Sequence, residues 1–216
     1  MRSDVGSRGP SDLVAAARAE GVRDARLLAA IRDVPRADFV PPALAEGAYE
    51  DRPLPIAHGQ VTTQPSLVAR MVEALGIRGE ERVLEIGTGF GWQTALLARL
   101  ADFVWSVERW PDLADEARPR LERAGARNVE VVVGDGSGGL PEHAPYDAIL
   151  VAAAFPTVPP ALAAQLADGG RLVQPLGPGG AEEVVLFERA DELLERRRLV
   201  ALAHFVRLVG RYGFKA

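Results

Sequence analysis

Residues 83–92 read Val-Leu-Glu-Ile-Gly-Thr-Gly-Phe-Gly-Trp, and this stretch decides the fold. It begins with the apolar composition of a buried strand, interrupted by one carboxylate, Glu85. Glycine then recurs at every second position, and a helical pattern begins at about Gln93. Because glycine has no Cβ and readily adopts positive φ, such a turn can be sharp and a ligand can lie against its backbone. The stretch therefore predicts a strand, a ligand-binding loop and a helix in succession.

The spacing of these glycines indicates the ligand. A dinucleotide-binding loop reads Gly-x-Gly-x-x-Gly, and its third glycine lets the helix pack close to the strand. Trp92 occupies that place here, and glycine recurs one residue earlier. The pattern acid-x-Gly-x-Gly-x-Gly instead resembles that of S-adenosylmethionine (SAM)-dependent methyltransferases. The resemblance implies SAM as cofactor and S-adenosyl-L-homocysteine as product, bound by Glu85, Gly87, Gly89 and Gly91. The alternative is a tight strand–helix turn without a ligand.

Length and composition fit one compact enzyme domain. A chain of 216 residues with 48% hydrophobic content can bury a single α/β core. No Pro-, Gly- or Ser-rich linker divides the chain. We therefore predict one methyltransferase domain over residues 1–216, in which 1–10 are flexible, 11–80 form a helical lead-in and acceptor loop, 81–175 form the SAM-binding core and 176–216 form C-terminal strands.

Several classes of function are disfavoured by composition. The absence of cysteine excludes disulfides, thiolate metal sites and cysteine nucleophiles. His58, His143 and His204 lack the spacing of metal ligands, so we expect no metal. A net charge of −5 argues against binding to nucleic acid. Residues 1–10 do not resemble a signal peptide, and the longest apolar stretch, residues 148–155, is too short to span a membrane. We expect a cytoplasmic monomer that binds no membrane.

The hydrophobic pattern predicts a Rossmann-like α/β fold. Helical spacing occurs in residues 13–19, 24–33, 65–75, 93–100, 112–123 and 160–166. Strand-like runs occur in residues 83–85, 103–107, 129–133, 148–151, 171–174, 183–188, 193–199 and 203–209. Residues 39–60 are rich in proline and glycine and predict a long, functional loop. Strands that are apolar on both faces belong to parallel sheets covered by helices. We predict a seven-stranded, mostly parallel sheet flanked by helices, with an antiparallel element from the last strands.

Acidic residues follow the first three strands of the predicted core. Glu85 lies at the end of the first strand, Glu108 ends the second, and Asp135 follows the third within Gly-Asp-Gly-Ser. The carboxyl ends of parallel strands meet at one edge of a sheet, where such folds bind their ligands. We therefore expect Glu108 to accept hydrogen bonds from the ribose hydroxyls of SAM. Asp135, together with Gly136, is expected to bind its adenine.

A second set of motifs resembles protein-L-isoaspartate O-methyltransferase. The motifs are Ala-Tyr-Glu-Asp-Arg-Pro-Leu-Pro-Ile at 48–56, His-Gly-Gln-Val-Thr-Thr-Gln-Pro at 58–65, Gly-Asp-Gly at 134–136, Ala-Pro-Tyr-Asp-Ala-Ile at 144–149, Gln-Leu-Ala-Asp-Gly-Gly-Arg-Leu-Val at 165–173 and His-Phe-Val-Arg-Leu-Val-Gly at 204–210. The likeness runs from about Leu27 to Phe214. It includes the segment before the SAM-binding core, which methyltransferases in general do not share.

The resemblance implies methylation of the α-carboxylate of L-isoaspartyl residues, and less well of D-aspartyl residues, in damaged proteins. The resulting ester collapses to a succinimide. It also implies that Gln60, Val61, Thr62 and Thr63 contact the cofactor. Thr63 stands where the family has its catalytic serine, so the resemblance makes its hydroxyl the donor to the substrate carboxylate, helped by backbone groups near Leu208 and Val209. Threonine keeps the donor but adds a methyl group.

Three alternatives remain at this stage. Thr63 is also well placed to cap the helix that starts at Pro65, since threonine is a good N-cap. The chain departs from the family pattern in the Val-Thr-Thr sequence at 61–63 and in Arg207, which replaces the family's usual proline. The Val-Thr-Thr variation favours, as a second hypothesis, a carboxyl methyltransferase dedicated to one aspartate of a peptide natural product or to a small carboxylate. A third is a SAM-binding module without catalysis.

Overall fold

The computed structural model describes residues 8–191 and 193–215. The flexibility expected of residues 1–10 thus lies mostly outside the described residues, and the first helix begins at Pro10. The helices are α1 (Pro10–Ala19), α2 (Ala25–Asp33), α3 (Pro65–Ala74), α4 (Trp92–Ala98), α5 (Pro111–Arg123) and α6 (Pro160–Ala164). The strands are β1 (Leu54–Pro55), β2 (Val61–Thr62), β3 (Arg82–Ile86), β4 (Phe103–Glu108), β5 (Val129–Val133), β6 (Tyr146–Val151), β7 (Leu166–Leu176), β8 (Glu182–Ala190) and β9 (Leu193–Ala203).

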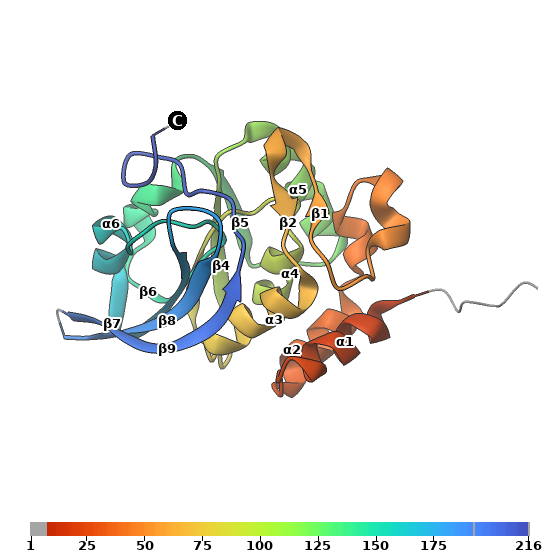
Figure 1. Ribbon diagram of the computed structural model, residues 1–216, viewed down its shortest axis with the longest axis horizontal. Coiled ribbons are helices and arrows are strands. Elements are labelled where there is room, and N and C mark those ends of the chain that lie inside the picture. The colour runs from red at the N-terminus through yellow and green to blue at the C-terminus, as the bar shows by residue number, and fades with distance from the viewer. Residues whose placement is uncertain (1–7, 192, 216) are drawn as a thin grey trace, which may run out of the picture.

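Seven strands form the central sheet, in the order β5-β4-β3-β6-β7-β8-β9 (Figure 1). Neighbouring strands are parallel from β5 through to β7, whereas β8 runs antiparallel to both β7 and β9. The predicted mostly parallel, seven-stranded sheet with an antiparallel end is confirmed. The strand order reverses between β3 and β6. In such folds the crevice outside the carboxyl ends of the strands at that point binds the ligand.

Two predicted elements are wrong. Residues 203–209 do not form a strand of their own, because the sheet ends with β9 and the chain then turns back over the cofactor edge. There Leu208 N–H donates to Ala154 O and Ala154 N–H to Val206 O, each at 2.8 Å. The apolar run thus pairs with the loop after β6. The helix predicted to reach Leu166 ends at Ala164, and Leu166 is already the first residue of β7.

The outer strand β5 is less buried than the sequence predicts. The β-branched run of residues 129–133 predicts a strand covered on both faces. The strand forms, but it lies at the edge of the sheet and its residues are only partly buried, with Val133 40% exposed. A β-branched run is therefore compatible with an edge position as well as a central one.

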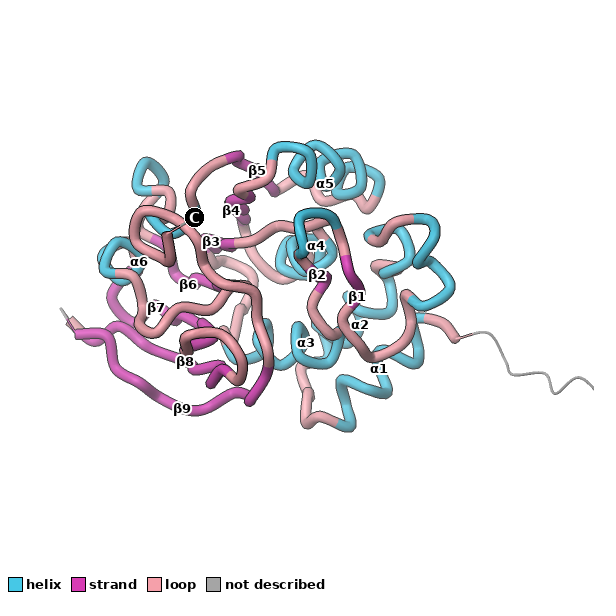
Figure 2. The backbone as a smooth tube through the Cα atoms, turned by 45° about the horizontal axis from the view of Figure 1, so that its top comes forward, coloured by secondary structure: helices cyan, strands magenta, loops and turns pink. Residues whose placement is uncertain are grey.

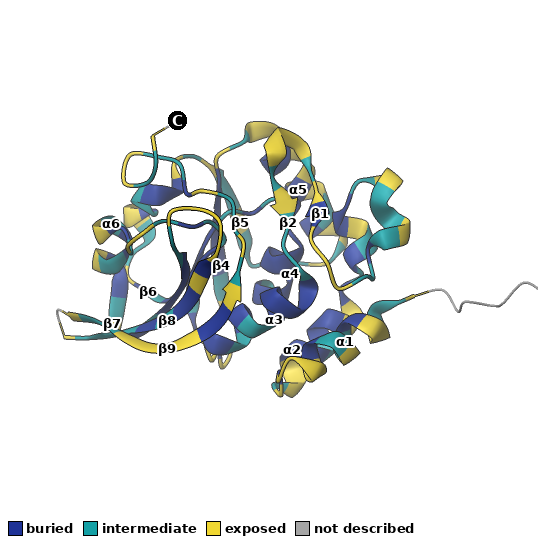
Figure 3. Ribbon diagram, viewed as in Figure 1, coloured by how far each residue is buried: buried dark blue, intermediate teal, exposed yellow. Residues whose placement is uncertain are grey.

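Alternating side chains of the strands belong to two separate cores. One face of the sheet packs against α3, α4 and α5, and the same core extends to α1 and α2, with Val83 and Val104 among its residues. The other face, which includes Leu84 and Ile86, is covered by α6, by short turns after β5 and by Leu208. Figure 3 shows this burial concentrated at the centre of the sheet. The side chain of Glu85, one residue before the strand ends, consequently points to the face that α4 covers.

The lead-in helices and the long loop pack beside the sheet (Figure 2). Asp24 caps α2 by accepting from the N–H groups of Arg26 and Leu27. The loop of residues 39–60 contains short 3-10 turns at Pro42–Gly47 and Ala57–Gly59, and the strand β1, which pairs with β2. Among the helices described, none is long and apolar enough to cross a membrane.

Candidate cofactor and acceptor site

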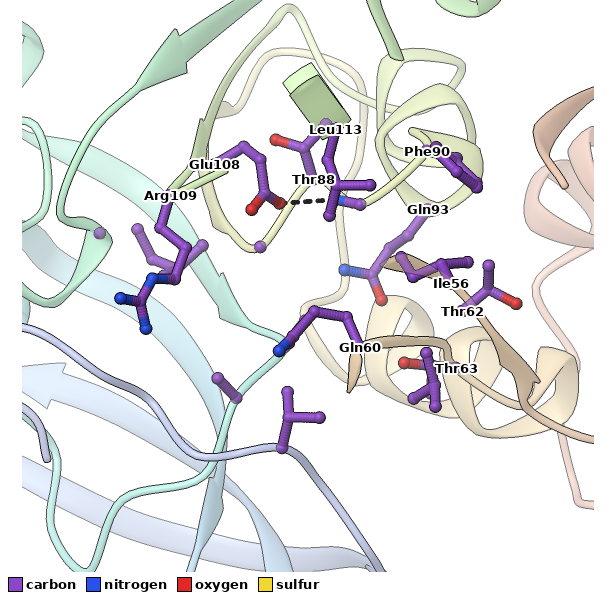
Figure 4. A pocket seen from close by; sticks show the side chains of 18 of the residues that line it. Ile56, Gln60, Thr62, Thr63, Thr88, Phe90, Gln93, Glu108, Arg109 and Leu113 are labelled. Carbon is purple, nitrogen blue, oxygen red and sulfur yellow. Dashed lines mark hydrogen bonds between the residues drawn. The ribbon is translucent and has the colours of Figure 1, made fainter. Parts of the chain in front are cut away.

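A cavity of about 940 Å³, part of it open to solvent, lies at the carboxyl ends of the central strands. Its walls come from the loop after β3, the end of β4, the loop after β6, the acceptor loop (residues 48–63) and the segment after β9. Figure 4 shows the side chains that converge there. The cavity's position outside the carboxyl ends of the parallel strands is the place where such folds bind their ligands.

The glycine loop forms the floor of this cavity. Gly87, Gly89 and Gly91 have φ values of 100°, 55° and 93°, in the left-handed region that favours glycine. A Cβ on Gly91 would lie 3.1 Å from Cγ of Leu121 in α5, so this glycine also allows α4 and α5 to pack closely. All three glycines line the cavity, as the sequence predicts.

Glu108 closes β4 and stands on the cavity wall. Its carboxylate accepts a hydrogen bond from Gly89 N–H at 2.9 Å and another from Trp110 N–H at 3.0 Å. The residue is only 5% exposed. A carboxylate has capacity for about four hydrogen bonds, so Glu108 retains capacity for a diol. The structure thus places Glu108 where the sequence predicts it, and adds that Glu108 braces the glycine loop.

Glu85 does not reach the cavity. Its side chain is fully buried and accepts from Gln93 at 2.8 Å, and from Thr94 and Ser106 at 2.5 Å each. Burial raises the pKa of Glu85 to about 7, although these three donors act in the opposite direction. The direct contact expected between Glu85 and SAM is thus absent from this arrangement. Gln93 lines the cavity and donates to Glu85, and Thr88, which also lines the cavity, is linked to Glu85 through the Ser106 hydroxyl.

Asp135 has an unexpected set of partners. Its carboxylate accepts from the N–H and hydroxyl of Ser137 and from Arg211 N–H, which belongs to the segment after β9. Burial alone would raise the pKa of Asp135, but the Arg211 and Ser137 donors outweigh it and hold the pKa below its ordinary value. Among the described residues, Gly136 lines the cavity but Asp135 does not. An adenine contact from Asp135 stays a prediction.

The acceptor loop supplies another wall. Gln60, Val61, Thr62 and Thr63 all line the cavity. The Thr62 hydroxyl, however, accepts from the guanidinium of Arg36 at 2.6 Å, and Figure 4 shows it directed away from the glycine loop. Thr62 therefore faces the cofactor cavity with its backbone or its methyl group, and its hydroxyl is engaged by Arg36.

The Thr63 hydroxyl points toward the interior of the site (Figure 4). In the part of the chain that the structure describes, α3 has Gln64 as its N-cap residue and receives no side-chain cap from it. The first turn is held from outside, because Asp51 accepts from Ser66 N–H at 2.8 Å and from the Gln64 side chain at 2.9 Å. Asp51 thus takes the capping role that was the alternative for Thr63.

Thr63 also belongs to a second cavity beside the first. This groove runs between α3 and the end of β9 and is lined by Glu20, Pro53, Val61, Thr63, Gln64, Ser66, Leu67, Arg70, Ala152, Ala201, Leu202, Ala203, His204, Phe205 and Val206. Thr63 and Val206 are among the residues that line both cavities. Leu208 and Val209, expected near the substrate, line the first cavity. Thr63 therefore stands at the junction of two binding spaces.

Several residues of the site were not predicted from the sequence. Gln93 and Arg109 line the cavity. From the sequence alone, Arg109 is expected to be an ordinary charged residue exposed to solvent. His58 adopts φ 58°, stacks on the Trp110 ring at 3.9 Å and bonds to Asp112 at 2.8 Å. It thereby joins the acceptor loop to the start of α5. The sequence contains no signal for this pairing, because the partners lie more than fifty residues apart.

A family model confirms the resemblance. The model described as "Protein-L-isoaspartate(D-aspartate) O-methyltransferase (PCMT)" matches residues 8–213. The chain belongs to this family. A protein-L-isoaspartate O-methyltransferase of Methanoculleus marisnigri is 53% identical over 198 residues, covering 92% of this chain and 90% of the relative. One of Anaeromyxobacter dehalogenans is 55% identical over 190 residues, covering 87% and 91%.

Solved structures share the fold of this family member. A protein-L-isoaspartate O-methyltransferase with 31% sequence identity superposes with a TM-score of 0.82, over 94% of this chain and 67% of the other. A Plasmodium falciparum protein described as a putative protein-L-isoaspartate O-methyltransferase, in complex with S-adenosyl-L-homocysteine, has a TM-score of 0.77 at 20% identity, over 94% and 99%. The second of these supports the fold alone.

Proposed function

We propose that this protein transfers the methyl group of SAM to the α-carboxylate of L-isoaspartyl residues, and less well to D-aspartyl residues, in damaged proteins and peptides. Methylation initiates repair, because the ester collapses to a succinimide. The observation that carries the proposal is the family match over residues 8–213, in a chain whose Thr63 lines both the cavity at the glycine loop and the groove beside it.

The residues of the first cavity suit SAM. We assign the methionine end to the glycine loop at Gly87, Gly89 and Gly91, beside Gln60 and Val61. The ribose is assigned to Glu108, which lies on the wall and retains acceptor capacity. The adenine is assigned to the neighbourhood of Asp135 and Gly136, of which Gly136 lines the cavity.

The chemistry requires positioning rather than proton transfer. When bound, SAM supplies a methyl group on a positively charged sulfur. The substrate carboxylate oxygen bonds to this methyl group as its bond to sulfur breaks, which gives a methyl ester and S-adenosyl-L-homocysteine. A substrate carboxylate is already ionised at pH 7, so no general base is needed. In the proposed arrangement Thr63 donates one hydrogen bond to the carboxylate, and backbone groups near Leu208 and Val209 hold it in line. Alignment of this kind can supply roughly 7–11 kcal/mol.

The proposal is tested by methyl transfer from labelled SAM to an isoaspartyl peptide and to its normal aspartyl isomer. We expect methyl-ester formation on the isoaspartyl peptide and almost none on its isomer. Equal labelling of both, or labelling of neither by a protein that binds SAM, would contradict it. The second hypothesis, a methyltransferase dedicated to one natural product or small carboxylate, is not favoured, because the relatives at 48–55% identity are protein-L-isoaspartate O-methyltransferases.

We further propose that the protein acts as a monomer in the cytoplasm, without nucleic acid or membrane. One chain supplies both cavities, and a net charge of −5 does not favour polyanions. Light scattering coupled to size-exclusion chromatography should give a mass close to 23.1 kDa. A mass twice as large would contradict the monomer.

A further inference from the structure

Arg36 is a completely buried arginine next to the acceptor loop. It lies in the short 3-10 turn Arg36–Phe39 and is 0% exposed. Its hydrogen-bond partners in the described chain are uncharged oxygens, and no carboxylate forms an ion pair with it there. Burying a charge without an ionic partner is unfavourable unless many hydrogen bonds offset the lost hydration. Such a residue therefore needs an explanation beyond core packing.

All of the oxygens that Arg36 contacts belong to residues 48–63. Its Nη1 donates to Ala48 O at 3.1 Å and to Glu50 O at 3.3 Å. Its Nη2 donates to Arg52 O at 3.2 Å, to the Thr62 hydroxyl at 2.6 Å and to Thr63 O at 3.2 Å. One guanidinium thus binds both ends of the acceptor loop, including the backbone of the residue proposed to orient the substrate.

The same guanidinium also faces the cofactor side. It lies 5.7 Å from the centre of the Trp92 ring, within the range of a cation–π contact. Trp92 starts α4 and lines the cofactor cavity, and its indole N–H donates to Val34 O at 3.1 Å. Arg36 therefore touches the acceptor loop and the first residue after the glycine loop at the same time.

We infer that Arg36 is a positioning residue for methyl transfer, whose guanidinium sets the distance between the Thr63 backbone and the glycine loop. The inference rests on the proposed function. Two forked N–H groups that point in fixed directions suit this task, because a lysine ammonium has no planar fork and cannot reproduce the geometry. Burial lowers the pKa of Arg36 to about 10, so the group stays charged at neutral pH.

Thr62→Val tests a single contact of Arg36, because it removes one hydrogen-bond acceptor of the guanidinium and nearly preserves the shape of the Thr62 side chain. Thr62→Ser restores a hydroxyl and serves as the rescue. Arg36→Lys and Arg36→Met remove the planar guanidinium with its Nη1 and Nη2 donors. Arg26→Met is the matched control, because Arg26 also holds two backbone oxygens, Ile77 O and Arg78 O, but away from the acceptor loop.

We expect Thr62→Val to lower kcat on an isoaspartyl peptide about tenfold, since small misplacements of a reacting group can reduce rates by that much or more. The Kd of SAM should stay within about threefold. Arg36→Lys should lower kcat further, Thr62→Ser should recover part of the kcat that Thr62→Val loses, and Arg26→Met should turn over nearly as the unaltered protein. Amide hydrogen exchange of residues 48–63 should quicken in Thr62→Val and Arg36→Lys, and stay unchanged in Arg26→Met.

The inference is overturned if Thr62→Val and Arg36→Lys keep full kcat, or if the exchange of residues 48–63 is unaffected. It is also overturned if Arg26→Met lowers kcat as much as they do, since Arg36 would then act only through general stability. If the proposed function itself is wrong, the unaltered protein does not methylate the isoaspartyl peptide. The hydrogen-exchange experiment still shows in that case whether Arg36 holds the acceptor loop. Arg36→Met, if it fails to fold, leaves the other variants decisive.

Discussion

The hydroxyl of Thr63 is directed into the site from a loop that is fixed on both sides. Its own carbonyl is held by Arg36, and the start of the following helix is held by Asp51. A β-branched side chain has few allowed χ1 rotamers, so the direction of this hydroxyl is well defined once its backbone is fixed. These contacts make a specific forecast possible for its removal.

Thr63→Val should lower turnover of an isoaspartyl peptide by roughly 10–1,000-fold with little change in Tm, because in the proposed arrangement the lost hydroxyl orients the substrate and does not cap α3. Peptide kinetics and a thermal melt check this together. Thr63→Ser keeps the donor and serves as the control, which should remain active. A variant that melts earlier, by about 1 kcal/mol of unfolding free energy, yet methylates normally would show that Thr63 is a cap after all.

Glu85 makes the stability of the protein depend on pH. Its pKa is about 7 when folded against an ordinary 4.5, because burial disfavours the charge. Between these values the folded protein retains a proton that the unfolded chain has released. The unfolding free energy therefore falls as pH rises through this window and levels off above about pH 7. The total effect is on the order of 3 kcal/mol, at about 1.4 kcal/mol for each pKa unit.

Glu85→Gln, which cannot ionise, isolates this contribution. Chemical unfolding of both proteins at pH 5 and pH 8 should show the variant gaining stability relative to the unaltered protein as pH rises. The comparison between the two proteins cancels the titration of all other groups. A stability difference that does not change with pH would mean that Glu85 is not buried in an uncharged form at low pH.

Among the elements, the junction between β3 and α4 has the strictest backbone requirements. Three left-handed glycines let the chain turn under the cavity, and α4 then packs against α5 at the position of Gly91. The turn serves two purposes, since it opens a binding surface and brings two helices together. A substitution at Gly91 affects both, whereas one at an open left-handed glycine affects only the backbone.

Gly91→Ala and Gly125→Ala separate these two effects. Gly125 also has positive φ, at 74°, but a Cβ there would meet no atom within 4 Å. Gly125→Ala should destabilise by about 1–2 kcal/mol through its left-handed backbone. Gly91→Ala must also displace Leu121, which should add about 1–3 kcal/mol and weaken S-adenosyl-L-homocysteine binding. Denaturant unfolding and titration calorimetry measure both, and equal losses for the two variants would contradict the packing role.

For the whole molecule, the cofactor cavity joins segments that are far apart in the chain. The acceptor loop, the glycine loop and the segment after β9 all contribute to its walls. The last of these is held by Ala154 and by Asp135, which accepts from Arg211 N–H. A ligand in the cavity therefore contacts elements that fold onto the sheet from both ends of the sequence, and its binding should stabilise all of them.

S-adenosyl-L-homocysteine at one hundred times its Kd should stabilise the protein by about 2.7 kcal/mol, which corresponds to a rise in Tm of about 5–10 °C. Hydrogen exchange should slow in residues 56–63, 87–93 and 206–211, with no local change in α1 and α2. Protection confined to residues 87–93 would show that the acceptor loop and the last segment do not close the cavity.

The sequence by itself determines the fold class, the cofactor loop and the family. Glycine spacing, strand periodicity and the motif at 58–65 are local features, and local steric preferences are enough to interpret them. Glu108, Gly136 and the residues 60–63 lie on the cavity wall, and their contacts with a cofactor stay a prediction. The end of β9 shows the limit of this approach, because an apolar run such as 203–209 pairs with whichever backbone groups the tertiary fold offers it.

Only the tertiary structure decided the contacts between distant segments. Whether Glu85 faces the cavity or α4 depends on the alternation of side chains at the end of β3, where a shift of one residue reverses the side. The tie between Asp135 and Arg211, and the burial of Arg36 beneath the acceptor loop, join residues separated by 76 and by up to 27 positions. Such pairings depend on how the elements pack against one another, and no spacing within a single segment encodes them.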